Sequence, residues 1–283
     1  MRAGRLVAAR IAAGIAATVA AGAVLLSAGG APAHAQAARL VSLDTPRGTR
    51  QAFILIRPSG PPVAWAVLFA GGNGALGLKS ASSMNWGAAN FLVRSRMMFV
   101  GHGLGVAVVD APSDRQDGMN AIFRMGRAHA GDIGAIAAYL KKDADVPVWL
   151  VGTSMGTFSA AAGAIASAGV DGLVLTSTIT RAKPDWKIAA SHRDGVASMP
   201  LGRVTVPTLI VSHRKDGCDV TPSSDAAKLK DRLVKARKVE VVLLDGGSPP
   251  QSEPCEAKAQ HGFLGIERQA VDAITAFVIA NPK

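Results

Sequence analysis

Apolar residues in this sequence fall into short runs, separated by segments in which apolar positions recur at helical spacing. Most of the runs are nearly continuous rather than alternating, which is typical of strands buried on both faces of a sheet. The predicted strands are residues 40–43, 51–57, 63–70, 104–110, 147–151, 172–176, 206–212 and 239–244. The predicted helices are residues 88–97, 126–142, an Ala-rich segment that ends near 169, 223–236 and 266–280. This alternation predicts an α/β fold, with a mostly parallel sheet of about eight strands and helices on both faces.

The first 35 residues carry a different pattern and are not expected to join this sheet. They hold, in order, a positive segment, an Ala-rich apolar stretch and a small-x-small site, namely Arg2, Arg5 and Arg10, residues 11–26, and Ala33-His34-Ala35. These features predict a signal peptide over 1–35, cleaved near Ala35, and one domain over 36–283. We expect a secreted or periplasmic protein without stable membrane insertion after cleavage; an uncleaved membrane anchor is the alternative.

Composition agrees with one globular domain, because 49% of the 283 residues are hydrophobic. The formal net charge is +11, and loss of the three arginines of the predicted signal lowers it to +8. The densest basic run, residues 228–238, contains no aromatic residue and is predicted to be the solvated face of one helix. We therefore expect no nucleic-acid partner.

The sequence Gly152-Thr153-Ser154-Met155-Gly156 lies between a predicted buried strand and a predicted helix. It matches the G-x-S-x-G pattern of a nucleophile elbow, in which a serine stands on a tight turn between strand and helix. Small residues are required two positions before and after the serine, because strand and helix crowd the chain there. Ser154 is the candidate nucleophile, at the positive end of the helix. The alternative is a glycine-rich turn with an idle serine.

A second glycine-rich segment, Gly71 to Gly77, follows the predicted strand at 63–70. It contains the G-x-G-x-x-G pattern, but no acidic residue lies between Asp44 and Asp110 to bind a ribose, so a nucleotide site is not expected. Such a loop can instead supply backbone N–H groups to an oxyanion hole. We predict that Met155 provides one donor and that either Gly72 or Asn73 provides the other; a plain tight turn is the alternative.

A serine nucleophile needs a histidine base and an orienting carboxylate. In open α/β sheets these groups gather at the carboxyl ends of strands. Two loops meet this condition, the loop at 212–222 and the loop at 245–262. They contain Asp216 and His261.

The order of these elements and motifs resembles the α/β-hydrolase fold superfamily, in particular secreted esterases and dienelactone-hydrolase-like enzymes. The resemblance extends over nearly all of the chain after the predicted signal. It implies a catalytic triad in the chain order Ser154, Asp216, His261. It also implies a site with a minimal cap or none, because residues 180–203 are too short for a cap domain.

The loop at 212–222 departs from the family pattern, which leaves alternatives open. Arg214 stands where glycine is usual, and Val220-Thr221-Pro222 carries an extra residue. Asp219 and Asp245 are alternative acids, and His213 is the alternative base. His129 and His192 are interpreted as structural or surface residues.

Cys218 and Cys255 are the two cysteines of a chain expected in an oxidising compartment, so one disulfide is predicted. It would join the loop of Asp216 to the loop of His261. We expect it to hold the carboxylate and the imidazole in register; general stapling of long loops is the alternative.

The predicted function is hydrolysis of an ester or related acyl bond in a small-molecule substrate through an acyl-enzyme. A peptidase or acyltransferase on the same scaffold, and a binding protein with a vestigial triad, are the alternatives. Trp186 and Met199 could form a small wall of the site or pack on the surface. No cofactor is expected, and no metal-ligand spacing is visible.

Overall fold

The structure is a computed structural model that describes residues 37–283, and the predicted signal peptide with its cleavage site at Ala35 lies outside this range. Within this range, eight strands form one sheet in the order β1-β2-β4-β3-β5-β6-β7-β8. They are β1 (Arg39–Asp44), β2 (Arg50–Ile56), β3 (Trp65–Phe69), β4 (Gly105–Val109), β5 (Val148–Thr153), β6 (Gly172–Thr176), β7 (Thr208–His213) and β8 (Val239–Leu244). The β1–β2 and β2–β4 pairs are antiparallel and the other pairs are parallel. The predicted mostly parallel α/β sheet is thus confirmed.

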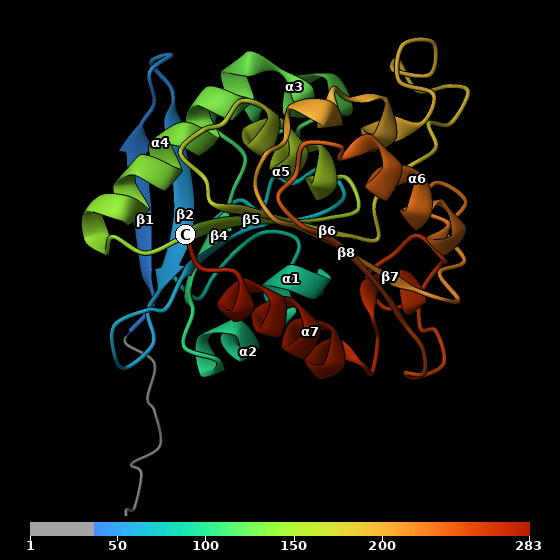
Figure 1. Ribbon diagram of the computed structural model, residues 1–283. Helices are drawn as coiled ribbons and strands as arrows, with labels where there is room; N and C mark the ends of the chain where they lie inside the picture. The colour runs from blue at the N-terminus through green and yellow to red at the C-terminus, as the bar shows by residue number, and fades with distance from the viewer. Residues whose placement is uncertain (1–36) are drawn as a thin grey trace, which may run out of the picture. The chain divides into compact units, whose positions relative to one another are not determined.

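Helices cover both faces of this sheet (Figure 1). They are α1 (Phe91–Arg94), α2 (Arg96–Gly101), α3 (Ala121–Met125), α4 (Arg127–Asp143), α5 (Gly156–Ile165), α6 (Ala226–Arg232) and α7 (Glu267–Ala280). Helices α3 to α6 lie on one face, and α1, α2 and α7 lie on the other. Strand β3 shows why its apolar run is continuous: Trp65, Val67 and Phe69 enter the first core, whereas Ala66 and Leu68 enter the second.

Three helical predictions need correction. The segment 88–97 is not one helix, because buried Ser95 separates α1 from α2 and its hydroxyl donates to the carbonyl of Phe91. The segment 223–236 contains only a 3₁₀ turn and the short α6. Helix α3 was not predicted, because it is only five residues long.

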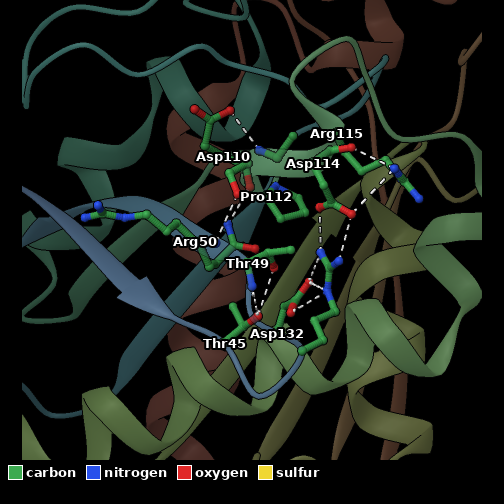
Figure 2. Close-up of polar contacts among 12 residues, drawn as sticks. Thr45, Thr49, Arg50, Asp110, Pro112, Asp114, Arg115 and Asp132 are labelled. Carbon is green, nitrogen blue, oxygen red and sulfur yellow. Dashed lines mark hydrogen bonds and ion pairs between the residues drawn. The ribbon is translucent and has the colours of Figure 1, made fainter.

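The β1–β2 turn is fixed to the sheet by charged side chains. Arg47 donates to both carboxylate oxygens of Asp132 on α4, and it forms a bidentate pair with Asp114 after β4. Figure 2 shows Asp114 and Asp132 beside the turn that contains Thr45 and Thr49. The hydrogen bonds from Arg47 lower the pKa of Asp114, and those two carboxylates raise the pKa of Arg47. The pairing compensates for the complete burial of the Asp132 side chain.

Among residues 37–283, no helix combines the length and the apolar character that a membrane span requires.

One polar side chain of the core has no hydrogen-bond partner for its ring within residues 37–283. His129 on α4 is fully buried between the rings of Phe69 and Phe123, and neither of its ring nitrogens has a hydrogen-bond partner among the described residues. Burial lowers the pKa of His129 to about 3, and the nearby charge of Arg124 adds to this effect.

His129 should therefore make the protein less stable in acid. Its pKa in the unfolded chain is about 6.5. Below that pH His129 is protonated in the unfolded chain, whereas in the folded chain it stays neutral down to about pH 3. Stability from this residue is complete above pH 6.5 and is lost as pH falls, with a limiting slope of roughly 1.4 kcal/mol per pH unit. His129→Leu should flatten the decline in the free energy of unfolding between pH 6 and 4, measured by urea titrations. An unchanged slope in the variant would contradict this assignment.

Candidate active site

Ser154 occupies a strained turn between β5 and α5. Its φ of 52° lies in the left-handed region, which is uncommon for a residue other than glycine. The turn is tight because β3, β5 and α5 touch: a Cβ on Gly152 would collide with the carbonyl of Gly156, and a Cβ on Gly156 would collide with the carbonyl of Phe69. Crowding between strand and helix was predicted to require these two glycines, and the backbone contacts agree with this prediction.

Backbone contacts hold Ser154 in this conformation. Its N–H donates to the carbonyl of Thr176 on β6, and its carbonyl accepts from both the N–H and the hydroxyl of Thr157. The Ser154 hydroxyl itself has no hydrogen-bond partner among residues 37–283 and lies at the N-terminus of α5. This leaves the hydroxyl available to a ligand or to a base.

His261 lies in the loop before α7 and contacts Asp216. Its Nδ1 is 3.1 Å from Oδ2 of Asp216, and both side chains are buried. A carboxylate oxygen only accepts, so Nδ1 carries the hydrogen and Nε2 is the free acceptor. Asp216 also accepts from the N–H of Cys218 and from the hydroxyl of Thr221. The carboxylate is thus fully engaged, and it fixes the orientation of the imidazole.

The structure distinguishes between the acid and base candidates by contact. Asp219 is exposed, and exposed Asp245 pairs with Lys215. Neither contacts His261. His213 is buried, and both of its ring nitrogens have backbone partners: Nε2 contacts the carbonyl of Gly246, and Nδ1 accepts from the N–H of Lys215.

Ser154 and His261 line one cavity of about 650 Å³, together with Gly71, Gly72 and Trp86. No hydrogen bond joins the Ser154 hydroxyl to Nε2 of His261, and Nε2 is buried without a partner in the described part of the chain.

The predicted oxyanion donors lie beside a second cavity. Gly72, Asn73 and Met155 line an apolar cavity of about 440 Å³, and only Gly72 belongs to both cavities. The N–H groups of Gly72, Asn73 and Met155 make no hydrogen bond within residues 37–283. Sequence reasoning missed Gly71, which approaches Ser154 so closely that a Cβ on it would lie 2.9 Å from Cβ of the serine.

The glycine-rich loop is anchored by an internal carboxylate. Buried Asp110, at the end of β4, accepts from the N–H groups of Leu76, Gly77, Leu78 and Ala111 at 2.7–3.2 Å. Amides that could cradle a phosphate are therefore occupied by a carboxylate of the chain itself. Within residues 37–283, no group of three His, Cys, Asp or Glu side chains is arranged to hold a metal ion.

The other residues predicted for the site lie in different parts of the structure. Trp186 lines the apolar cavity, whereas Met199 is buried in the core. Residues 177–207 contain only two short 3₁₀ helices, Gly195–Ser198 and Leu201–Arg203, so the expected minimal cap is found. Thr221, the extra residue of Val220-Thr221-Pro222, hydrogen-bonds to Asp216, and this contact was not predicted.

No protein-family model and no curated protein matches the sequence. Solved structures do match it. An esterase from Pyrococcus furiosus superposes with a TM-score of 0.59 at 12% identity, over 86% of this chain and 91% of that chain. A cold-adapted esterase from an Arctic intertidal metagenomic library gives 0.57 at 15% identity, over 87% and 94%. A puromycin-hydrolyzing peptidase from Mycobacterium tuberculosis gives 0.57 at 15% identity, over 86% of this chain and 39% of the other.

At these identities the likeness concerns the fold, and it agrees with the strand order and the elbow described above. The protein has the α/β-hydrolase fold, as the order of its motifs predicts.

The predicted disulfide between Cys218 and Cys255 is present. Cys218 also donates its N–H to Asp216, and Cys255 lines the cavity of Ser154 and His261. The covalent bond therefore joins a residue that hydrogen-bonds to Asp216 to a residue in the wall of the cavity. This position fits a role in registering the two loops.

Replacement of both cysteines by alanine tests that role. Loss of a cross-link that spans 37 residues should lower the free energy of unfolding by about 3 to 4 kcal/mol in the chain-entropy model. In the variant that is still folded, the NMR signal of the His261 Nδ1 hydrogen should broaden, because the Asp216 loop is less constrained. If the Nδ1 hydrogen signal of the variant stays sharp and unshifted up to the unfolding transition, the disulfide stabilises the loops without holding Asp216 and His261 in register.

Proposed function

We propose that this protein is a secreted serine hydrolase that cleaves carboxylic esters or related acyl bonds of small molecules. The observation that carries the proposal is the buried Asp216–His261 contact, which leaves Nε2 of His261 without a partner among the described residues, while His261 lines the same cavity as the strained Ser154. The predicted signal peptide and the disulfide support secretion.

In the proposed reaction, His261 accepts the proton of the Ser154 hydroxyl as its oxygen attacks the acyl carbon. Asp216 holds the imidazole in the required tautomer and stabilises the imidazolium. The oxyanion is bound by the N–H of Met155 and by an N–H of Gly72 or Asn73. His261 then protonates the leaving group, and a water molecule activated by the same imidazole hydrolyses the acyl-enzyme.

The two cavities support an assignment of the two halves of the substrate. The leaving group has to lie near His261, because that residue protonates it, so it occupies the 650 Å³ cavity. The acyl chain then extends past Met155 into the 440 Å³ cavity, whose walls include Met119, Ile122 and Trp186. These walls favour an apolar acyl group.

The most direct test of the proposal is covalent labelling with a fluorophosphonate. Wild-type protein should be labelled on Ser154 and should lose activity in parallel, whereas Ser154→Ala should not be labelled. Ser167→Ala is a matched control, because Ser167 is also a serine with a left-handed backbone, at φ 51°, but on the exposed surface. Absence of labelling in folded wild-type protein would favour a binding protein with an inactive triad.

The choice of acid predicts a second, quantitative result. Asp216→Asn should lower kcat for a p-nitrophenyl ester by roughly 10⁴-fold, because the amide favours the wrong tautomer of His261. Asp219→Asn removes the same charge three residues away and should leave kcat within about twofold of the wild type, since Asp219 does not contact the imidazole. Equal effects of the two substitutions would refute the assignment of Asp216.

A further inference from the structure

A buried arginine lies directly behind the loop that carries the predicted oxyanion donors. Arg124 on α3 has no exposed surface. Its guanidinium donates to the carbonyl of Gly72 at 3.2 Å, to the carbonyl of Met119 at 3.2 Å and to the hydroxyl of Ser159 on α5 at 3.0 Å. All three acceptors are neutral, and no carboxylate among the described residues pairs with it.

Such an arrangement is unfavourable for stability alone, because a buried charge is costly unless an opposite charge compensates for it. Desolvation lowers the pKa of Arg124 to about 9, which still leaves the guanidinium charged at neutral pH. The contrast with Arg47, which faces two carboxylates, shows that this chain pairs other arginines. An uncompensated charge at this position therefore calls for a role beyond packing.

The loop is shaped around the guanidinium. A Cβ on Gly74 would collide with Nη2 of Arg124, so only glycine leaves room for the charged group to reach the Gly72 carbonyl. Asn73 is held from the other side, because its carbonyl accepts from Met119 at 2.8 Å and its side chain accepts from the N–H of Ala75 at 3.1 Å. The segment 72–74 thus has one defined conformation.

The Gly72 carbonyl and the Asn73 N–H belong to one planar, trans peptide group and point in opposite directions. When Arg124 holds that carbonyl, the Asn73 N–H is directed to the opposite side of the peptide, and it makes no hydrogen bond within residues 37–283. The N–H of Gly72 is separated from this fixed peptide by a single residue. A cation bound to the carbonyl also polarises the peptide and makes its N–H a stronger donor.

We propose that Arg124 is a positioning residue of the oxyanion hole, which fixes and polarises the peptide between Gly72 and Asn73 for an oxyanion formed at Ser154. The inference rests on the proposed hydrolase function. It predicts that the positive charge and the several N–H donors of the guanidinium at position 124 stabilise the tetrahedral intermediate more than they stabilise the bound substrate.

The test compares Arg124→Gln and Arg124→Lys with the wild type on a p-nitrophenyl ester and on a boronic acid, whose adduct with serine is a tetrahedral anion. Arg124→Gln should lower kcat on the order of 10²-fold with KM within a few fold, and should weaken boronate inhibition by a similar factor. Arg124→Lys keeps the charge but not the fork, so it should recover part of both losses. The control is Arg127→Gln, which removes an exposed arginine three residues away and should change neither value.

Three results would overturn the proposal. One is a folded Arg124→Gln variant with wild-type kcat and boronate affinity. Another is a loss expressed in KM alone, which would assign Arg124 to substrate binding, or unfolding of both Arg124 variants, which would make Arg124 a part of the fold only. The third is a wild-type protein that neither hydrolyses esters nor reacts with fluorophosphonate, which refutes the hydrolase function itself and this inference with it; in the first two results wild-type activity is intact.

Discussion

The architecture of the site depends on one steric constraint, the close approach of α5 to strands β3 and β5. Neither Gly152 nor Gly156 has room for a side chain, because backbone carbonyls occupy that space. The chain between them has to turn within a few residues, which forces Ser154 into the left-handed region. The surrounding sheet stabilises this strain through the hydrogen bond from Ser154 to Thr176. The conformation of the serine is thus a consequence of packing two layers, not of the serine itself.

A second constraint acts on the loop after β3, which is held between buried groups of opposite charge. The carboxylate of Asp110 binds amides at positions 76–78, and the guanidinium of Arg124 binds the carbonyl at position 72. Both contacts join a charge to a neutral peptide, which makes them stronger than hydrogen bonds between neutral groups. A loop rich in glycine has high conformational entropy when free. The two charges supply the order that the glycines alone cannot provide.

The fold could be predicted because its signals are local. Continuous apolar runs identify buried strands, and β6 and β8 have the predicted bounds. Ser95 shows where local pattern fails: its hydroxyl bonds to Phe91 and divides a helix whose apolar spacing looks unbroken. The partner of His261 could not be chosen from the sequence, which left three aspartates open; in the structure Asp216 is the one that contacts His261. Arg124 escaped prediction because its contact with Gly72 joins residues distant in the chain, and Thr221 escaped because no motif marks its hydrogen bond to Asp216.

The same polar atoms that lower stability are those that a hydrolytic site would need. Nε2 of His261 is buried and has no partner among residues 37–283, so it loses its hydration without a compensating bond. Its surroundings are rigid: the carbonyl of His261 accepts from Ser177 at 2.8 Å, and Arg94 bonds to the carbonyl of the next residue at 2.6 Å. The imidazole itself is held by the contacts of its Nδ1 with Asp216 and Thr221. A hydroxyl that enters from the adjoining cavity is the group that can satisfy it, and Ser154 lines that cavity. In the proposed hydrolase, this unpaired acceptor receives the proton of Ser154 when the serine attacks.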